Sequence, residues 1–368
     1  MKKSALTIAI SSLLLASGAH AATVYNQNDT KLEIGGRAQG AYYGTDNDAK
    51  EGDQSYFRVN MRGETKIAPE MKAFGFAEYN LPTSGSDKDE LRYAYAGIKH
   101  DRFGAFSYGR QDGLFAIVND YTDVLPEWGG DGLGKDTEAF GTGRTNGVAK
   151  YMFNQNGLTL GVQFTGNNDP QNAGRSAITK SFNGNNYNGE SWNSTGSTEG
   201  FAVAASYDFD MGLGLSAAYN QAGKTDEQAR YAAFGGDHDA KLMGVGAKYA
   251  SGNLYLAATY AHSEDHIFVK NGYAEKSDGY EAVAQYTIGK FKPSLAYLRT
   301  DVKNDTNVSF DDTLTEYVSI GAWYNFTNNF NAYVDYKLNL LDEDGSTSKS
   351  KLGQNTDDVV GVALQYNF

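Results

Sequence analysis

Histidine is the side chain that enzymes most often use as a general base, and the sequence contains five histidines. Three of them, His238, His262 and His266, fall in expected loops or at strand ends. The H-S-E-D-H run at 262–266 does not follow the H-E-x-x-H pattern of metalloproteases, and G-K-T at 223–225 lacks the upstream glycine of a phosphate-binding loop. The sequence also lacks the G-x-S-x-G motif of serine hydrolases. We therefore expect no enzymatic activity, no metal and no cofactor.

Arginine and carboxylate side chains, by contrast, recur at every second position in several segments. Arg58, Arg62 and Glu64 share one side of their segment, whereas Val59 and Met61 share the other. In a dry core an unsatisfied polar group costs about 1–3 kcal/mol, whereas in a water-filled interior this penalty does not arise. These rows of charge therefore suit a surface that encloses water, where they can sort ions and polar solutes.

The same alternation extends along most of the chain and predicts β-strands. In 330–340, read as F-N-A-Y-V-D-Y-K-L-N-L, the first residue and every second one after it are apolar, and the residues between them are mostly polar. The last segment places its large apolar side chains at 360, 362, 364, 366 and 368. Glycine, at 43 of 368 residues, and the many aromatic residues also favour strands over helices.

Sixteen such segments can be counted, and short turns alternate with long polar stretches between them. The segments are 31–43, 55–67, 71–81, 90–100, 103–110, 146–153, 157–165, 199–209, 212–221, 240–251, 253–263, 277–288, 290–300, 314–326, 330–341 and 355–368. An even number of strands, with short turns at one end and long loops at the other, is typical of transmembrane β-barrels, whose closed sheet leaves no backbone group unpaired in lipid. We therefore predict an all-β fold, a 16-stranded antiparallel transmembrane β-barrel that is wide enough for an aqueous channel.

The composition excludes several other classes of protein. Without cysteine the chain has no disulfide, cysteine–zinc site or iron–sulfur cluster. A formal net charge of −13 argues against nucleic acid as a partner, because phosphate groups attract basic surfaces. Beyond the N-terminus no run approaches the roughly 18 apolar residues of a spanning helix. A soluble β-sandwich is the main alternative fold, but its second strand face would be packed with large apolar side chains, and here that face is polar.

The first 21 residues have the three parts of a secretory signal peptide. Lys2 and Lys3 give the positive region, 5–16 the apolar stretch, and A-H-A at 19–21 the small-x-small cleavage pattern. A short membrane anchor is the alternative, but the apolar stretch is too short to span a bilayer. We expect cleavage after this pattern, which leaves 22–368 as a single exported barrel domain. Loss of the two lysines changes the net charge from −13 to −15.

One long stretch, 111–145, differs from the other loops because it carries apolar side chains. These are Leu114, Phe115, Ile117, Val118, Leu125 and Trp128. A loop of this length inside a compact protein is usually functional. Its apolar groups would be satisfied by packing on the inner wall, so we expect the segment to fold into the barrel.

Within this stretch, P-E-W-G-G-D at 126–131 resembles the P-E-F-G-G-D signature of the third loop in the general trimeric porins of Gram-negative outer membranes. Asp123, R-Y-A-Y-A-G at 92–97, Y-G-R at 108–110 and the terminal Y-N-F are also similar to that family. The resemblance spans the mature chain. It implies a homotrimer in contact with outer-membrane lipid and lipopolysaccharide, and a third loop that folds inward to narrow the barrel. It also implies a passive channel for ions and small hydrophilic solutes.

The same resemblance implies roles for individual residues. A basic wall is expected from Arg37, Arg58, Arg92 and Arg144, opposite the loop carboxylates of Asp123 and Glu127. Glu78 matches an acidic residue beside the arginines, and Tyr333 and Asp335 match wall residues that help to hold the loop tip. The loop motif comprises Pro126, Trp128, Gly129, Gly130 and Asp131. Phe368 matches the C-terminal signal that the barrel assembly machinery recognises.

Three positions depart from the family pattern. Glu90 stands where lysine is frequent, and Ser319 stands where an acidic residue often supports the loop. The 82–89 connection is shorter than the second loop that usually latches onto a neighbouring subunit. Together with the net charge, Glu90 predicts a weak preference for cations.

Three functional alternatives remain open. A substrate-selective porin, for sugars or anions, would carry a file of aromatic residues, and Tyr317, Trp323 and Tyr333 are expected to face inward without forming an obvious line. An adhesin or structural anchor would conduct poorly. In a filled lumen the arginines would only neutralise neighbouring carboxylates.

Overall fold

The computed structural model describes residues 21–46, 51–83, 90–134, 139–167, 197–225, 228, 238–269, 272–304, 310–344 and 349–368. Apart from Ala21, the expected signal segment lies outside the described residues, as does most of the 82–89 connection. Among the described residues, no helix is long and apolar enough to cross a membrane.

Sixteen long strands make up most of the described chain. They are β2 (Thr30–Gly44), β4 (Tyr56–Ala68), β5 (Met71–Pro82), β6 (Glu90–His100), β7 (Gly104–Asp112), β8 (Arg144–Gln155), β9 (Leu158–Thr165), β10 (Gly200–Asp208), β11 (Leu213–Ala222), β12 (Ala240–Ser251), β13 (Leu254–Glu264), β16 (Lys276–Tyr286), β17 (Phe291–Asn304), β18 (Phe310–Asn325), β19 (Phe330–Asn339) and β20 (Val359–Asn367). Each matches one of the sixteen predicted segments, with ends that differ by at most four residues.

The other elements of the described residues are short. They are the strands β1 (Ala22–Gln27), β3 (Gly52–Asp53), β14 (Phe268–Val269) and β15 (Gly272–Tyr273), and one helical turn, α1 (Ala116–Asn119). Connections such as 69–70 and 156–157 are two residues long and lie at one end of the barrel, the turn end. The longer connections lie at the opposite end, the loop end, as the alternating lengths predicted.

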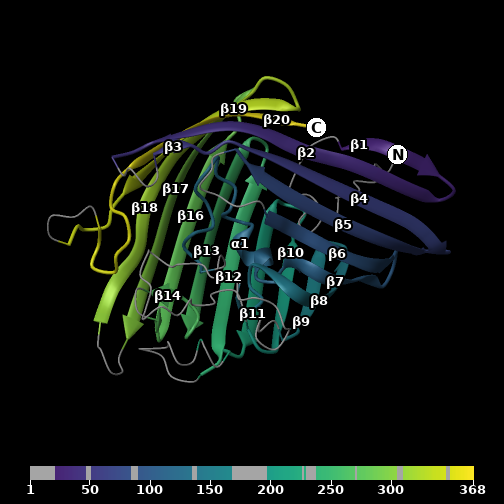
Figure 1. Ribbon diagram of the computed structural model, residues 1–368, viewed down its shortest axis with the longest axis horizontal. Helices are drawn as coiled ribbons and strands as arrows, with labels where there is room; N and C mark the ends of the chain where they lie inside the picture. Colours follow the sequence, from purple (N-terminus) through teal and green to yellow (C-terminus); the bar gives the residue numbers. More distant parts are fainter. Residues whose placement is uncertain are drawn as a thin grey trace.

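The first long strand closes the ring of strands by pairing with the last. One edge of β2 pairs with β4, and the other edge is shared between β1 and β20. Gly36 and Phe368 exchange two backbone hydrogen bonds of 2.9 and 3.1 Å at the point where β20 ends. Figure 1 shows the purple β2 beside the yellow β20. We call this junction the seam. It confirms the closed antiparallel barrel, in which each of the sixteen long strands is paired on both sides, and shows that the soluble sandwich is wrong.

The strands present an apolar outer face and a more polar inner face. On β9, Leu160, Val162 and Phe164 point outward and are 43–54% exposed, whereas Gln163 and Thr165 point inward and are buried. A large apolar outer surface is unfavourable in water but suits the hydrocarbon of a membrane. The alternation seen in the sequence therefore separates a lipid-facing surface from a polar interior.

Candidate functional site

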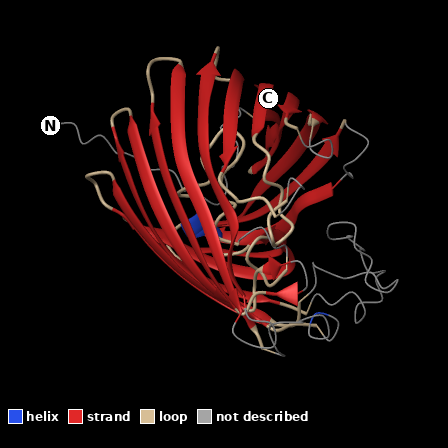
Figure 2. Cartoon of the chain, turned by 90° about the vertical axis from the view of Figure 1, so that its left-hand side faces the viewer, coloured by secondary structure: helices blue, strands red, loops and turns tan. Residues whose placement is uncertain are grey.

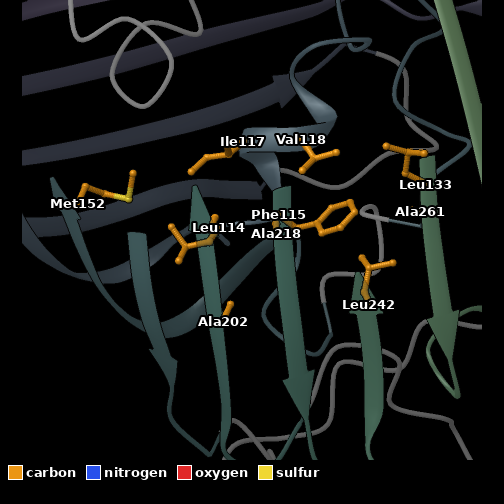
Figure 3. Packing of buried hydrophobic residues seen from close by; sticks show 11 residues of the cluster. Leu114, Phe115, Ile117, Val118, Leu133, Met152, Ala202, Ala218, Leu242 and Ala261 are labelled. Atoms are coloured by element: carbon orange, nitrogen blue, oxygen red, sulfur yellow. The ribbon is translucent and has the colours of Figure 1, made fainter. Parts of the chain in front are cut away.

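The connection between β7 and β8, residues 113–143, is called the third loop here; its described parts, 113–134 and 139–143, lie against the inner face of the barrel. It starts with the turn of α1, which Figure 2 shows inside the ring of strands. Its buried side chains pack against inward-facing side chains of β8 to β13 (Figure 3). They are Leu114, Phe115, Ile117, Val118 and Leu133, packed against Met152, Ala202, Ala204, Ala218, Leu242 and Ala261. The apolar residues that set this loop apart in the sequence thus form a hydrophobic core between loop and wall.

Glu281, a buried carboxylate on β16, holds the middle of the third loop. One of its oxygens accepts the Gly132 N–H at 2.7 Å, and the other accepts the hydroxyl of Thr122. The Thr300 hydroxyl on β17 donates to the Gly132 carbonyl oxygen at 2.8 Å. A single carboxylate on β16 therefore binds the third loop at two points, Thr122 before the tip and Gly132 after it.

The tip of the third loop carries the P-E-W-G-G-D motif and is fixed by Asp335 on β19. The Asp335 carboxylate accepts the backbone N–H of Glu127 at 3.0 Å and that of Trp128 at 3.4 Å. It also accepts the hydroxyl of Ser319 at 2.6 Å. Ser319, which departs from the acidic residue of the family, thus contacts the side chain that holds the tip.

The Glu127 carboxylate reaches both sides of the seam. The hydroxyls of Tyr43 on β2 and Tyr333 on β19 both donate to it. The Trp128 ring packs on the Tyr43 ring, with centroids 5.5 Å apart. The loop tip therefore crosses the interior and meets the strands that close the barrel.

Two glycines give the motif its turn. Gly130 has φ of +75°, a left-handed conformation that favours glycine. A Cβ on this residue would lie 2.7 Å from Asn119 Nδ2 and 3.1 Å from the carboxyl carbon of Asp123. Asp123 packs against Gly129 and Gly130 while its side chain stays exposed. Asp131, the last motif residue, accepts the hydroxyl of Tyr317 at 2.9 Å.

Arg37 and Arg58 lie directly opposite each other on β2 and β4. Arg37 donates to Asn367 Oδ1 at 3.0 Å and to the Tyr56 hydroxyl at 3.3 Å. Arg58 donates to Asn80 Oδ1 at 3.1 Å, and its guanidinium lies 4.7 Å from the centre of the Tyr56 ring. Like charges in opposite positions repel, so these amide, hydroxyl and ring partners stabilise the pair without cancelling its charge.

Two carboxylates neutralise the other half of the arginine row. Glu78 Oε1 accepts a hydrogen bond from Arg92 Nε at 2.9 Å and lies 3.7 Å from Arg58 Nε. Glu90 lies 3.4 Å from Arg92 Nη1 and 3.5 Å from Arg144 Nη1. Glu90, which stands where the family often has lysine, therefore bridges two of the four arginines.

A β-bulge in β6 directs Arg92 into this cluster. The register pairs Glu78 with Tyr93 and Tyr79 with Leu91, which leaves Arg92 as an extra residue. Strict alternation would put Arg92 and Tyr93 on opposite faces of the strand, but the bulge turns both toward the interior. The sequence pattern does not show the bulge.

A chain of hydrogen bonds links the arginine row to the loop tip. Arg37 donates to the Tyr56 hydroxyl at 3.3 Å, and Tyr56 donates to Gln39 Oε1 at 3.0 Å. Gln39 Nε2 then donates to the Tyr333 hydroxyl at 3.2 Å, and Tyr333 donates to Glu127. Three residues that the sequence singled out, Arg37, Tyr333 and Glu127, thus belong to one chain of hydrogen bonds.

Two buried charged residues of the site were missing from the predicted set. Glu281 anchors the loop as described, and Lys150 on β8 donates to the carbonyl oxygen of Asp112 at 2.8 Å, where the loop starts. Alternation along 277–288 and 146–153 places both side chains on the inner face, so the pattern contained the signal. It did not contain their partners, which lie far away in sequence.

The histidines of the H-S-E-D-H run do not converge on one site. His262 pairs with Asp278 at 3.0 Å, whereas His266 is fully buried and 3.4 Å from the Thr142 hydroxyl. Burial, and to a smaller extent the nearby Lys224 ammonium, lowers the pKa of His266 to about 3. Within the described part of the chain, no group of three or more metal-ligating side chains occurs.

A family model described as Gram-negative porin matches residues 27–368. The chain belongs to the Gram-negative porin family. Outer membrane porin N of Escherichia coli K12 is 36% identical to this porin, and the putative outer membrane porin protein NmpC of the same organism is 37% identical. Both alignments cover 100% of each chain.

The comparison with solved structures agrees. A structure of Salmonella typhi OmpF in complex with daunomycin is 30% identical, with a TM-score of 0.80 over 94% of this porin and 100% of that chain. OmpT of Vibrio cholerae, at 16% identity and a TM-score of 0.67 over 92% of this porin and 99% of that chain, shares the fold. The chain is therefore a general diffusion porin of a Gram-negative outer membrane and not an enzyme, as the sequence predicted.

Proposed function

We propose that the third loop and the arginine row form the constriction of this channel. In this proposal Arg37, Arg58, Arg92 and Arg144 stand on one side, and Asp123 and Glu127 stand on the other. The observation that carries it is the placement of the Glu127 carboxylate at a loop tip held by Asp335, Tyr43 and Tyr333. The arginines lie on β2, β4 and β6 and at the start of β8.

Opposed rows of charge explain the preference for polar solutes. Unit charges about 8 Å apart attract by roughly 2 kcal/mol at an effective dielectric of about 20, and water in the pore lowers this value. The transverse field orders water and separates cations from anions on opposite walls. An apolar solute must disrupt this ordered water, whereas a small hydrophilic solute exchanges hydrogen bonds with it.

Ion selectivity follows from the balance of charges in the constriction, and we infer a weak preference for cations. Glu78 and Glu90 offset Arg92 and Arg144, while the loop carboxylates add negative charge. The expected mature charge of −15 acts in the same direction. Reversal potentials in a salt gradient across a planar bilayer measure this preference, and a clear anion preference would contradict it.

Replacing Arg58 tests the constriction directly. We expect Arg58→Ala to change single-channel conductance and to increase the preference for cations, because the arginine row loses one positive charge. Lys290→Ala is the matched control, since Lys290 is an exposed turn residue that donates to the Phe326 carbonyl oxygen. If Arg58→Ala and Lys290→Ala both behave as wild type, the assigned constriction is wrong.

Homotrimer formation is the second part of the proposal. On the outer face of β2 and β4, a Cβ on Gly40 or Gly63 would meet no atom within 4 Å. A hollow of about 490 Å³ at the seam has Gly40, Tyr42, Val362 and Leu364 in its lining. Small outward residues allow close approach of a second barrel, and filling the hollow with Gly40→Trp should dissociate the trimer on unheated gels. A wild-type protein that sediments as a monomer in mild detergent would contradict this.

Export and assembly complete the proposal. Residues 1–21 direct secretion and are removed, and Phe368 serves as the terminal signal for the barrel assembly machinery. The Phe368 ring stacks on Phe57 with centroids 5.7 Å apart, at the outer surface that would face lipid and lipopolysaccharide. N-terminal sequencing of the protein from outer membranes tests the cleavage after Ala21.

The sugar-selective alternative gains no support from the aromatic side chains. Tyr317 is fully buried and donates to Asp131, so its ring face is not open to a sugar. Trp323 and Tyr333 pack against each other edge to face, with centroids 4.9 Å apart. These rings form a cluster beside the loop tip and not a file along the pore.

A further inference from the structure

Four polar groups on the inner wall lack partners among the described residues. The Trp323 Nε1, Asn331 Oδ1 and Ser294 Oγ atoms are buried without a hydrogen bond. In the described part of the chain the Lys292 ammonium has no hydrogen bond or ion pair, and it lies 5.9 Å from the centre of the Trp323 ring. Buried polar groups in native proteins almost always have a partner, so such a cluster indicates a site for a bound molecule.

The register places these groups together on three adjacent strands. Lys292 on β17 opposes Trp323 on β18, and Trp323 opposes Tyr333 on β19. Ser294 lies two residues from Lys292 on the same face, and Asn331 lies two residues from Tyr333. The cluster lies between the turn end and the loop tip, because Tyr333 holds the tip and Lys292 comes two residues after a short turn.

Lys292 lacks the carboxylate partner that several other strand lysines have. Three other strand lysines each have a carboxylate within 4.0 Å: Lys72 with Glu64, Lys248 with Asp208, and Lys337 with Asp131. Lys292 has an indole ring in place of a carboxylate. A half-buried cation without a counter-charge favours a bound anion.

We propose that Lys292, Trp323, Ser294 and Asn331 form a subsite for a small hydroxylated carboxylate, such as a sugar acid. The subsite rests on the proposed channel function and deepens it. The carboxylate accepts from the Lys292 ammonium and the Trp323 indole N–H. A neighbouring hydroxyl of the solute donates to Asn331 Oδ1, and the Ser294 hydroxyl donates or accepts as needed. Asn331 Oδ1 can only accept a hydrogen bond, which is the reason why a hydroxylated anion fits better than a simple one.

Current block in single-channel recordings tests the subsite. Glucuronate is added to either side of the bilayer, and glucose serves as the neutral probe of similar size. We expect glucuronate to interrupt the current of wild-type porin and to do so more often when it is added at the turn end. Trp323→Phe removes the N–H and keeps a ring, and Lys292→Gln removes the charge. Each should weaken glucuronate binding by about tenfold, the effect of one hydrogen bond to a charged group.

Lys290→Gln is the control, because this neighbouring lysine is exposed and should leave glucuronate binding unchanged. Equal block by glucose and glucuronate would mean that the cluster does not recognise the carboxylate, and the proposal would fail. Glucuronate block that persists in both Trp323→Phe and Lys292→Gln would place the anion elsewhere and would also overturn it. A wild-type protein that opens no channel at all would instead overturn the proposed function.

Discussion

Individual carboxylates in this porin hold different parts of the site. Glu281 accepts the Gly132 N–H and the Thr122 hydroxyl and has no basic side chain within ion-pair distance among the described residues. Glu90 bridges Arg92 and Arg144. The first carboxylate fixes the backbone of the third loop, whereas the second sets the charge of the wall.

Removing the Glu281 anchor should loosen the third loop. Glu281→Ala leaves two donors of the loop without an acceptor, at a cost of about 1–3 kcal/mol each. Glu281→Gln keeps an acceptor oxygen for Gly132 and should retain most of the anchoring. We expect open-channel current noise to rise markedly in Glu281→Ala and little in Glu281→Gln. Quiet channels in both variants would show that other contacts suffice to hold the loop.

Changing Glu90 should shift ion selectivity in proportion to charge. Glu90→Gln frees one positive charge on Arg92 and Arg144, and Glu90→Lys adds another. The reversal potential in a tenfold salt gradient should therefore move toward anion preference in two steps, with the larger shift in the lysine variant. Glu51→Gln, at an exposed carboxylate near Tyr42, is the control of equal charge change. Identical shifts in Glu51→Gln and Glu90→Gln would mean that only net charge matters.

At the scale of elements, the third loop depends on another loop for support. The 265–275 connection packs Ile267 beside Gly134, and the Tyr273 ring lies 5.5 Å from the Phe140 ring. His266 is buried between them, 5.4 Å from Phe140. Two loop-end connections therefore share one apolar contact with a neutral histidine inside it.

Acid should weaken this contact between loops. The folded pKa of His266 is about 3 and its ordinary value is 6.5, so the neutral ring contributes its full stability above pH 6.5. That stability is lost as the pH falls from 6.5 toward 3, and at pH 4.5 the loss reaches up to about 2.7 kcal/mol. Amide hydrogen exchange in 267–274 should accelerate between pH 7 and pH 4.5 beyond its intrinsic change, and His266→Gln should remove the excess. The prediction fails if wild type and variant share the same pH dependence.

The strands could be read from the sequence because each carries its own signal, whereas contacts between distant elements carry none. Alternation located all sixteen strands and the inward side of Arg58. The period breaks at the bulge, where Arg92 and Tyr93 both face the interior although they are adjacent in sequence. The loop motif indicated where to look for the site, but the pairing of Gly132 with Glu281 depends on tertiary structure that no local pattern records.

At the scale of the whole molecule, the seam decides whether the barrel closes. Gly36 on β2 lies between the backbone of β4 and the end of β20, next to the ring of Phe368. A Cβ there would lie 2.2 Å from the Arg58 carbonyl oxygen and 2.7 Å from the Phe368 ring. Gly40 lies four residues further along the same strand, and a Cβ there would have no atom within 4 Å.

Gly36→Ala should therefore impair closure, because the backbone or the terminal ring must shift to admit the methyl group. We expect a lower yield of the compact species that migrates fast on unheated gels. Gly40→Ala adds the same methyl group in open space and should fold as wild type. Equal yields from both variants would show that the seam tolerates the displacement.

The seam also has a consequence for biogenesis. Arg37 and Asn367, which bond across it, are 330 positions apart, so the contact that completes the cylinder joins nearly the whole length of the polypeptide. Contacts of such long sequence separation form slowly. In a chain that emerges amino end first, the edge of β2 that pairs with β20 must stay unpaired until the final residues arrive. A copy that lacks β20 cannot close the seam, and it leaves an edge of β2 without its partner.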